Sequence, residues 1–113
     1  MVHEMKLQAV YFDKIKAGQK IYEGRLFDEK RRLISVGDWI EFKKEPELTE
    51  KFMAKVLALL HFESFEKMAK ILPLEKLGFE NETKEQVVET YHQFYSEKEE
   101  YEYGVVAIQV EVK

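Results

Sequence analysis

Residues 52–62 constrain the fold most, because their side chains separate onto two faces with a period of two along eleven positions. Side chains two residues apart lie on the same face of a β-strand. One of the two faces would carry six apolar side chains: Phe52, Ala54, Val56, Ala58, Leu60 and Phe62. We therefore predict one long strand here, and a chain that contains a β-sheet.

Three other segments, residues 20–26, 39–43 and 103–112, have the same period and predict further strands. In the second, Ile40 and Phe42 point the same way. In the last, four β-branched residues point toward the core: Val106, Ile108, Val110 and Val112.

Helical signals lie between the strands. Residues 8–17 are followed by Gly18, a favoured residue just past a helix end, and Ser64 can cap a helix over residues 65–71. A capping box that begins at Thr83 opens a third helix. The apolar stripe of that helix has five members: Val87, Val88, Tyr91, Phe94 and Tyr95. The order of helix, several strands, two helices and strand favours an α+β fold, a small mixed β-barrel with about three short helices.

The length of 113 residues suits a single domain over 1–113, and the hydrophobic fraction of 45% is enough for a core. No cysteine is present, which excludes disulfides and thiol catalysis and fits a cytoplasmic protein. The three histidines are far apart in sequence, so we expect no metal and no other cofactor. No apolar run of membrane-spanning length and no secretion signal occurs, so we expect no membrane association.

Charge is divided unevenly along the chain, whose net charge is −4. Residues 1–56 hold 12 Lys and Arg against 10 Asp and Glu, whereas residues 57–113 hold 6 against 12. A protein that coats nucleic acid without sequence preference is normally basic overall, because it neutralises phosphates. The balance disfavours that class, but it is compatible with a locally basic pocket that holds one nucleotide or a short single strand.

The most informative segment is residues 18–26, where Lys20, Glu23 and Arg25 lie at the junction of a helix end and a strand. Glu23 and Arg25 share a strand face, and Lys20 stands at the strand entrance. An arginine offers a planar fork to a phosphate or base edge, a glutamate accepts from an exocyclic amine, and a lysine donates or, with a lowered pKa, acts as a base. An ordinary salt bridge at one end of a barrel explains the same pattern.

The pattern G-x-K-x-x-E-x-R, formed by Gly18, Lys20, Glu23 and Arg25, resembles the signature of the ASCH domain, a PUA-like barrel. Residues 25–32 and 37–42 are similar to the segment that follows this motif in archaeal and bacterial members. Residues 95–108 are similar to their last helix and strand, so that the resemblance covers most of residues 10–112. It implies a domain that binds RNA in a cleft lined by the signature.

The resemblance also implies an alternative activity, because one bacterial branch of the family hydrolyses the N4-acetyl group of N4-acetylcytidine with a Lys, a Thr and a Glu. By motif position Lys20 and Glu80 match the lysine and the glutamate, but Glu23 stands where the threonine is expected. A carboxylate that attacks an amide forms a mixed anhydride, which is a harder route. Glu23 would instead activate a water, with Lys20 or Arg25 stabilising the oxyanion.

Other residues have two interpretations each. The basic cluster from Lys30 to Arg32 is either a phosphate contact or a solvated loop. The ring of Tyr103 either stacks on a base or closes the barrel. We interpret residues 97–100 as a solvated acidic loop, and both His61 and His92 as structural.

The sequence thus favours a module that binds RNA or a nucleotide-like small molecule. Its expected ligand contacts are six side chains: Lys20, Glu23, Arg25, Lys30, Arg32 and Tyr103. The alternative is a small amidohydrolase that acts on N4-acetylcytidine or a similar acylated nucleoside through Lys20, Glu23 and Glu80. A third hypothesis is a protein–protein adaptor, which requires a large exposed apolar patch.

Overall fold

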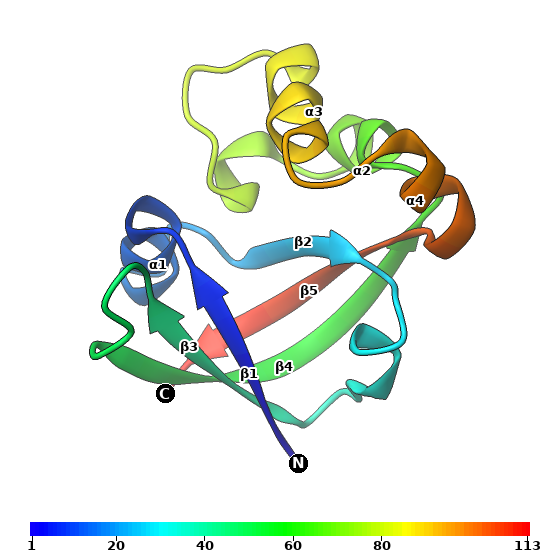
Figure 1. Ribbon diagram of the computed structural model, residues 1–113. Coiled ribbons are helices and arrows are strands. Elements are labelled where there is room, and N and C mark those ends of the chain that lie inside the picture. The colour runs from blue at the N-terminus through cyan, green and yellow to red at the C-terminus, as the bar shows by residue number, and fades with distance from the viewer.

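A five-stranded sheet curls into an open half-barrel in the computed structural model, which describes residues 1–113 (Figure 1). The strand order is β1-β3-β4-β5-β2, with β1 parallel to β3 and every other pairing antiparallel. The strands are β1 (Val2–Leu7), β2 (Tyr22–Leu26), β3 (Trp39–Lys44), β4 (Lys51–Phe62) and β5 (Val105–Val112). The edge strands are therefore β1 and β2, and the α+β fold expected from the sequence is confirmed.

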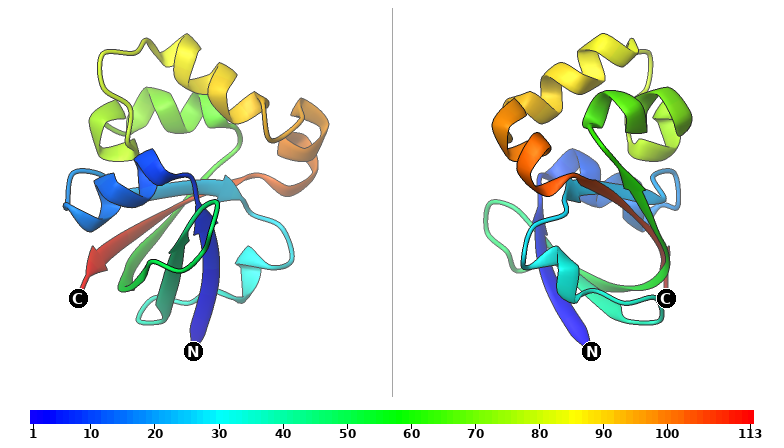
Figure 2. Two further views of the ribbon diagram at one scale, coloured as in Figure 1. Left: turned by 60° about the vertical axis from the view of Figure 1, so that its left-hand side comes forward. Right: turned by 90° about the vertical axis from the view of Figure 1, so that its right-hand side faces the viewer.

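Four α-helices accompany the sheet, one more than about three expected: α1 (Ala9–Lys16), α2 (Phe65–Ile71), α3 (Lys84–His92) and α4 (Glu97–Tyr103). The last three form a layer on one side of the half-barrel, and α1 lies beside the ends of β1 and β2 (Figure 2). Short 3₁₀ turns, η1 (Arg31–Leu33) and η2 (Leu74–Leu77), complete the elements. None of these helices combines the length and the apolar character needed to cross a membrane.

Two clusters of apolar side chains hold the fold together. One fills the half-barrel and contains Phe12, Ile40 and Phe42, and the other lies between the sheet and the helical layer and contains Phe65 and Met68. β5 contributes to both clusters because it is buried on both faces. Four of its consecutive residues are at most 1% exposed: Val105, Val106, Ala107 and Ile108. The face of β5 that was predicted to point toward the core is thus buried, and the opposite face is buried as well.

A β-bulge near Leu57 changes the two faces predicted for the long strand. Val56 pairs with Val110 and Ala58 with Gln109, so one extra residue is inserted in β4. A bulge leaves the extra residue unpaired and re-aims the side chains that follow it. Accordingly Leu57 is 41% exposed, while Leu60 packs in the helical-side cluster rather than with Val56.

Residues 97–100, expected as a solvated loop, are instead the first turn of α4. The hydroxyl of Ser96 accepts from the amide of Glu99, whose carboxylate accepts in return from the amide of Ser96. This capping box begins the helix despite the acidic run. Glu100 is 6% exposed; it accepts a hydrogen bond from the amide of Phe65 and pairs with His92, so it links α4 to α2 and α3.

Candidate functional site

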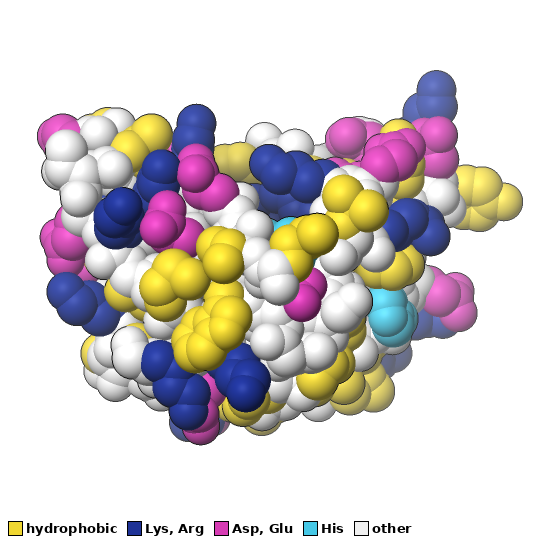
Figure 3. All heavy atoms as spheres, turned by 90° about the horizontal axis from the view of Figure 1, so that it is seen from below, with side chains coloured by type: hydrophobic (Ala, Val, Ile, Leu, Met, Phe, Trp, Pro, Cys, Tyr) yellow, Lys and Arg dark blue, Asp and Glu magenta, His cyan; other side chains and the backbone are white.

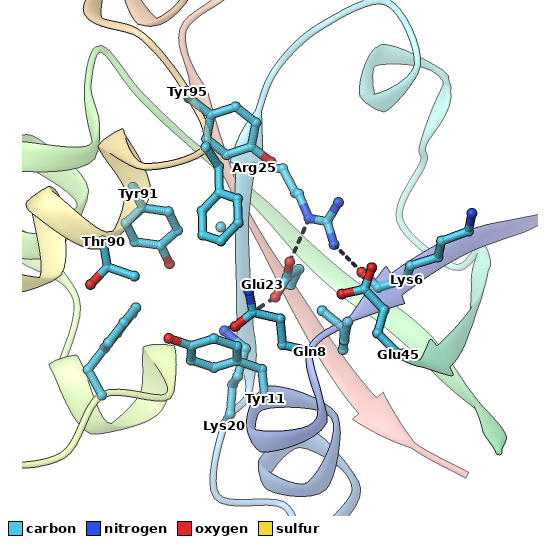
Figure 4. A pocket seen from close by; sticks show the side chains of 14 residues that line it. Lys6, Gln8, Tyr11, Lys20, Glu23, Arg25, Glu45, Thr90, Tyr91 and Tyr95 are labelled. Carbon is cyan, nitrogen blue, oxygen red and sulfur yellow. Dashed lines mark hydrogen bonds and ion pairs between the residues drawn. The ribbon is translucent and has the colours of Figure 1, made fainter. Parts of the chain in front are cut away.

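A cavity of about 220 Å³ opens at the seam between the two edge strands of the half-barrel. The end of β1 contributes Lys6 and Leu7, and β2 contributes Glu23 and Arg25. The guanidinium of Arg25 donates from Nη2 to the carbonyl oxygen of Lys6 at 3.0 Å, which joins the two edges. The remaining walls come from α1, from α3 and from residues outside the helices and strands, among them Glu45, Phe79, Phe94 and Tyr95 (Figure 4).

Lys20 enters the cavity floor because the chain turns sharply after α1. Gly18 has a φ of +80°, and the amide of Lys20 returns to the carbonyl of Lys14 at 3.1 Å. The lysine stem then passes Gly78, where a Cβ would lie 2.8 Å from Lys20 Cδ, so a glycine leaves the room it needs. The entrance of β2 is thus shaped around one buried lysine.

The ammonium of Lys20 has its hydrogen-bonding capacity filled. Nζ lies 2.7 Å from the carbonyl oxygen of Tyr22, 2.6 Å from that of Leu77 and 3.3 Å from Oε1 of Glu23. An ammonium has three N–H donors, which matches these three acceptors. Burial lowers the pKa of Lys20, and the nearby Glu23 opposes that change. In this arrangement Lys20 serves as a hydrogen-bond donor to all three acceptors.

Glu23 lies between two cations. Its Oε1 faces Lys20, and its Oε2 accepts from Nε of Arg25 at 2.6 Å. Burial disfavours the ionised form, but Arg25 and Lys20 together outweigh burial and hold the pKa of Glu23 below its ordinary value. The carboxylate is therefore ionised at neutral pH, and the three groups together carry one net positive charge.

Arg25 is the cation of this triad with donors to spare. Two of the five guanidinium N–H groups are used, by Glu23 and by the carbonyl of Lys6. Burial would lower the pKa of Arg25, but the carboxylate of Glu23 outweighs it and raises that pKa. Both Nη1 hydrogens and one Nη2 hydrogen remain available beside the cavity.

Aromatic rings form the wall opposite the triad. The ring of Tyr91 lies 5.7 Å from that of Phe79, edge to face, and is stacked from behind on Phe65 at 4.3 Å. Tyr11, from α1, packs on Phe79 at 5.7 Å. Burial raises the pKa of Tyr91 well above its usual value, so its hydroxyl stays protonated. The wall therefore offers ring faces and neutral hydroxyl groups.

Figure 4 places Lys20, Glu23 and Arg25 together in one cavity. The salt bridge between Glu23 and Arg25, which by itself would explain the sequence pattern, is also present. Both residues line the cavity, so the salt bridge does more than close one end of the barrel. Glu80 is exposed and does not line the cavity, and neither does exposed Lys30.

Arg32 and Tyr103 lie together at a second place. The guanidinium of Arg32 covers the ring of Phe27 at 4.4 Å, and its Nη2 lies 3.5 Å from the carbonyl of Tyr103. Tyr103 ends α4 and does not begin the last strand. These two predicted ligand contacts are therefore outside the cavity.

Several cavity residues were missed from the sequence, among them Gln8, Tyr11 and Thr90. They come from segments far from the signature, and no local pattern sets them apart. Tyr91 and Phe94 belong to the apolar stripe that the helical spacing predicts. No group of His, Asp and Glu side chains in the fold is arranged to hold a metal ion.

The half-barrel, its helical layer and the charged cavity at its seam define a small α+β domain of the PUA-like type. Hypothetical protein PH0355, known from a crystal structure, is 42% identical to this chain, with a TM-score of 0.91 and coverage of 100% of both chains. Protein PF0455 from Pyrococcus furiosus, known from a solution NMR structure, is 38% identical, with a TM-score of 0.81 over 99% of this chain and 97% of that one.

A crystal structure of ASCH from Zymomonas mobilis has the same fold, with 14% identity and a TM-score of 0.68 over 97% of this chain and 66% of that one. No curated protein matches the chain. The model of the ASCH domain matches residues 5–113, and the chain belongs to this family.

Proposed function

We propose that this protein binds single-stranded RNA or a nucleotide-like ligand in the cavity at the β1–β2 seam. The observation that carries the proposal is the unused donor set of Arg25, held in place by Glu23 and facing a cavity with an aromatic wall. Arginine is well suited to phosphate because its planar N–H fork matches two oxygens. Unpaired bases are commonly recognised by stacking on aromatic rings.

Glu23 supplies the acceptor that base recognition needs. A carboxylate has about four lone-pair directions, of which Lys20 and Arg25 occupy two. An exocyclic amine of a base would donate to Glu23 while a phosphate meets Arg25. The family assignment supports the same class of ligand, because the ASCH domain is associated with RNA binding.

Hydrolysis of N4-acetylcytidine has weaker support. The N–H donors of Lys20 are matched by three acceptors, and exposed Glu80 lies outside the cavity. The adaptor hypothesis also has weaker support. On the face seen in Figure 3, hydrophobic side chains form several groups with charged side chains between them, whereas an adaptor requires one large apolar patch.

Fluorescence anisotropy with labelled single-stranded RNA tests the proposal. We expect Arg25→Ala to weaken binding at least about tenfold, since charge-assisted hydrogen bonds to phosphate are lost. The slope of log affinity against log salt should be about −0.7 for each phosphate contacted. Lys67→Ala is the matched control, because Lys67 is exposed and pairs only with Glu63.

Binding that is unchanged in Arg25→Ala would contradict the proposal. Incubation with N4-acetylcytidine, followed by chromatography for cytidine, tests the alternative. Turnover that disappears in Lys20→Ala would favour the hydrolase.

A further inference from the structure

Phe94 occupies an unusual position for a large apolar side chain. It is 57% exposed, although the period of α3 predicts it on the buried stripe, and it lines the cavity. The helix ends at His92, two residues earlier. The amides of Phe94 and Tyr95 both donate to the carbonyl of Tyr91 at 3.0 Å, so a hydrogen-bonded turn fixes the position of Phe94.

The rings of Tyr91 and Tyr95, which also line the cavity, are stacked on Phe65, whereas the ring of Phe94 has no stacking partner. Phe65 stacks on Tyr91 at 4.3 Å and on Tyr95 at 5.5 Å. The ring of Phe94 contacts one other ring, that of Tyr95, with centroids 6.5 Å apart and planes tilted by 55°. One face of an aromatic ring is thus left in solvent beside a charged cavity.

The size of the cavity limits what can enter it. Its volume of about 220 Å³ lies below the roughly 300–1,000 Å³ of pockets that enclose drug-sized ligands. A space of this size suits one base rather than two. The exposed ring of Phe94, together with Arg25 and Lys6 of the same lining, can hold a second base and the phosphate that precedes it.

We propose that the site binds two consecutive nucleotides of a single strand, with one base in the cavity, the next stacked on Phe94, and the linking phosphate on Arg25. The inference rests on the proposed function and names its ligand more closely, as a strand rather than a mononucleotide. Stacking depends little on base identity, because every base has a π-face. Phe94 would therefore contribute affinity and leave base choice to the cavity.

Titrations with ribonucleotides of increasing length, followed by NMR chemical shifts, test the inference. The probes are the four nucleoside 5′-monophosphates, a mixed pool of the sixteen dinucleotides, and a pool of tetranucleotides. We expect affinity to rise about 5- to 100-fold from one nucleotide to two, the range for one base–aromatic stack, and to rise much less from two to four.

Phe94→Ala should remove this gain, so that the variant binds dinucleotides about as weakly as it binds mononucleotides. Tyr101→Ala is the matched control, because Tyr101 is 94% exposed and lies outside the cavity. The thermal midpoint of Phe94→Ala is measured alongside and should be unchanged, since the side chain removed is exposed.

Two results overturn the inference but leave the proposed function standing. In one, mononucleotides bind as tightly as dinucleotides. In the other, Phe94→Ala weakens both ligands equally or affects neither. If no ribonucleotide of any length binds the unaltered protein, both the inference and the proposed function fail.

Discussion

Replacing Glu23 with Gln removes the anion between two buried cations. The side chains of Lys20, Glu23 and Arg25 are 3%, 9% and 14% exposed, so water screens their charges poorly. Glutamine has nearly the same shape, and the substitution therefore changes charge more than packing. The two remaining positive charges would face each other across a neutral amide.

The expected cost is about 3–5 kcal/mol of unfolding free energy, the usual range for removing one partner of a buried ion pair. Domains of this size are stable by about 5–15 kcal/mol, so the variant should still fold. Its thermal midpoint should fall by roughly 10–20 °C, because about 1 kcal/mol corresponds to several degrees in a domain of this length.

Urea unfolding followed by the fluorescence of Trp39, the single tryptophan, measures the change. Glu111→Gln is the matched control, because the ion pair of Glu111 with Lys113 is half exposed on both sides. Exposed pairs contribute little, so the control should have an unfolding midpoint equal to that of the unaltered protein. A Glu23→Gln variant as stable as the control would refute the reasoning that the triad is a coupled buried unit.

The pH dependence gives an independent check of the same residue. The pKa of Glu23 is held below its ordinary value by Arg25 and Lys20 against the effect of burial. Its stabilising contribution is therefore complete above the unfolded value of about 4.3 and disappears as the pH falls through the lower folded value. The difference in stability between the unaltered protein and Glu23→Gln should shrink over that acidic range.

Three further predictions concern the packing of Gly24, the start of α2 and the carboxylate of Asp38. Gly24→Ala would place a Cβ 2.8 Å from the hydroxyl of Tyr91, and should cost about 1–3 kcal/mol by overpacking, measured by urea unfolding. Glu100→Ala leaves the first amide of α2 without its acceptor and should cost about 1–3 kcal/mol, measured by thermal unfolding. Asp38 has its pKa lowered to about 2, chiefly by its hydrogen bond with His3, so its carboxyl should titrate by NMR near pH 2, and its stabilising contribution should be lost only as the pH falls toward that value. His3→Ala should move that midpoint up.

Local sequence patterns were sufficient to predict those helix starts and strand faces that depend only on neighbouring residues. The start of α3 is fixed by the capping box at Thr83, and α2 begins after Ser64 as expected. Ile40 and Phe42 are fully buried on one face of β3. The cluster of Lys20 with its neighbours was also predictable, because the three signature residues lie within six positions of each other.

Features that depend on long-range pairing could not be predicted in the same way. β1 was not predicted, because its alternation of apolar and charged residues covers only Glu4 to Leu7 and its parallel pairing with β3 joins segments about 37 positions apart. The bulge at Leu57 has no glycine to mark it and becomes visible only in the pairing of β4 with β5. In α4, the box formed by Ser96 and Glu99 was a usable signal, but the acidic run obscured it.

The aromatic wall of the cavity illustrates the same limit. Tyr11 and Tyr91 are 80 positions apart in sequence and both line the cavity with Phe79. A stripe at helical spacing predicts burial, but it does not show which member faces a solvent-filled hollow. Phe94 was therefore assigned to the core, although the helix ends before the stripe reaches it.

Arg25 has to join the edges of the half-barrel and also leave donors for a ligand, and the fork of an arginine allows both. Its Nε and one Nη2 hydrogen hold Glu23 and the carbonyl of Lys6, while the remaining three hydrogens stay free. A lysine is a point charge with three donors and no fork, so Arg25→Lys should keep the ion pair with Glu23 but lose the bidentate contact to phosphate. We expect this variant to lose less stability than Glu23→Gln, yet to bind single-stranded RNA about tenfold more weakly. Full binding by Arg25→Lys would mean that charge alone suffices and that the geometry of the guanidinium has no role in recognition.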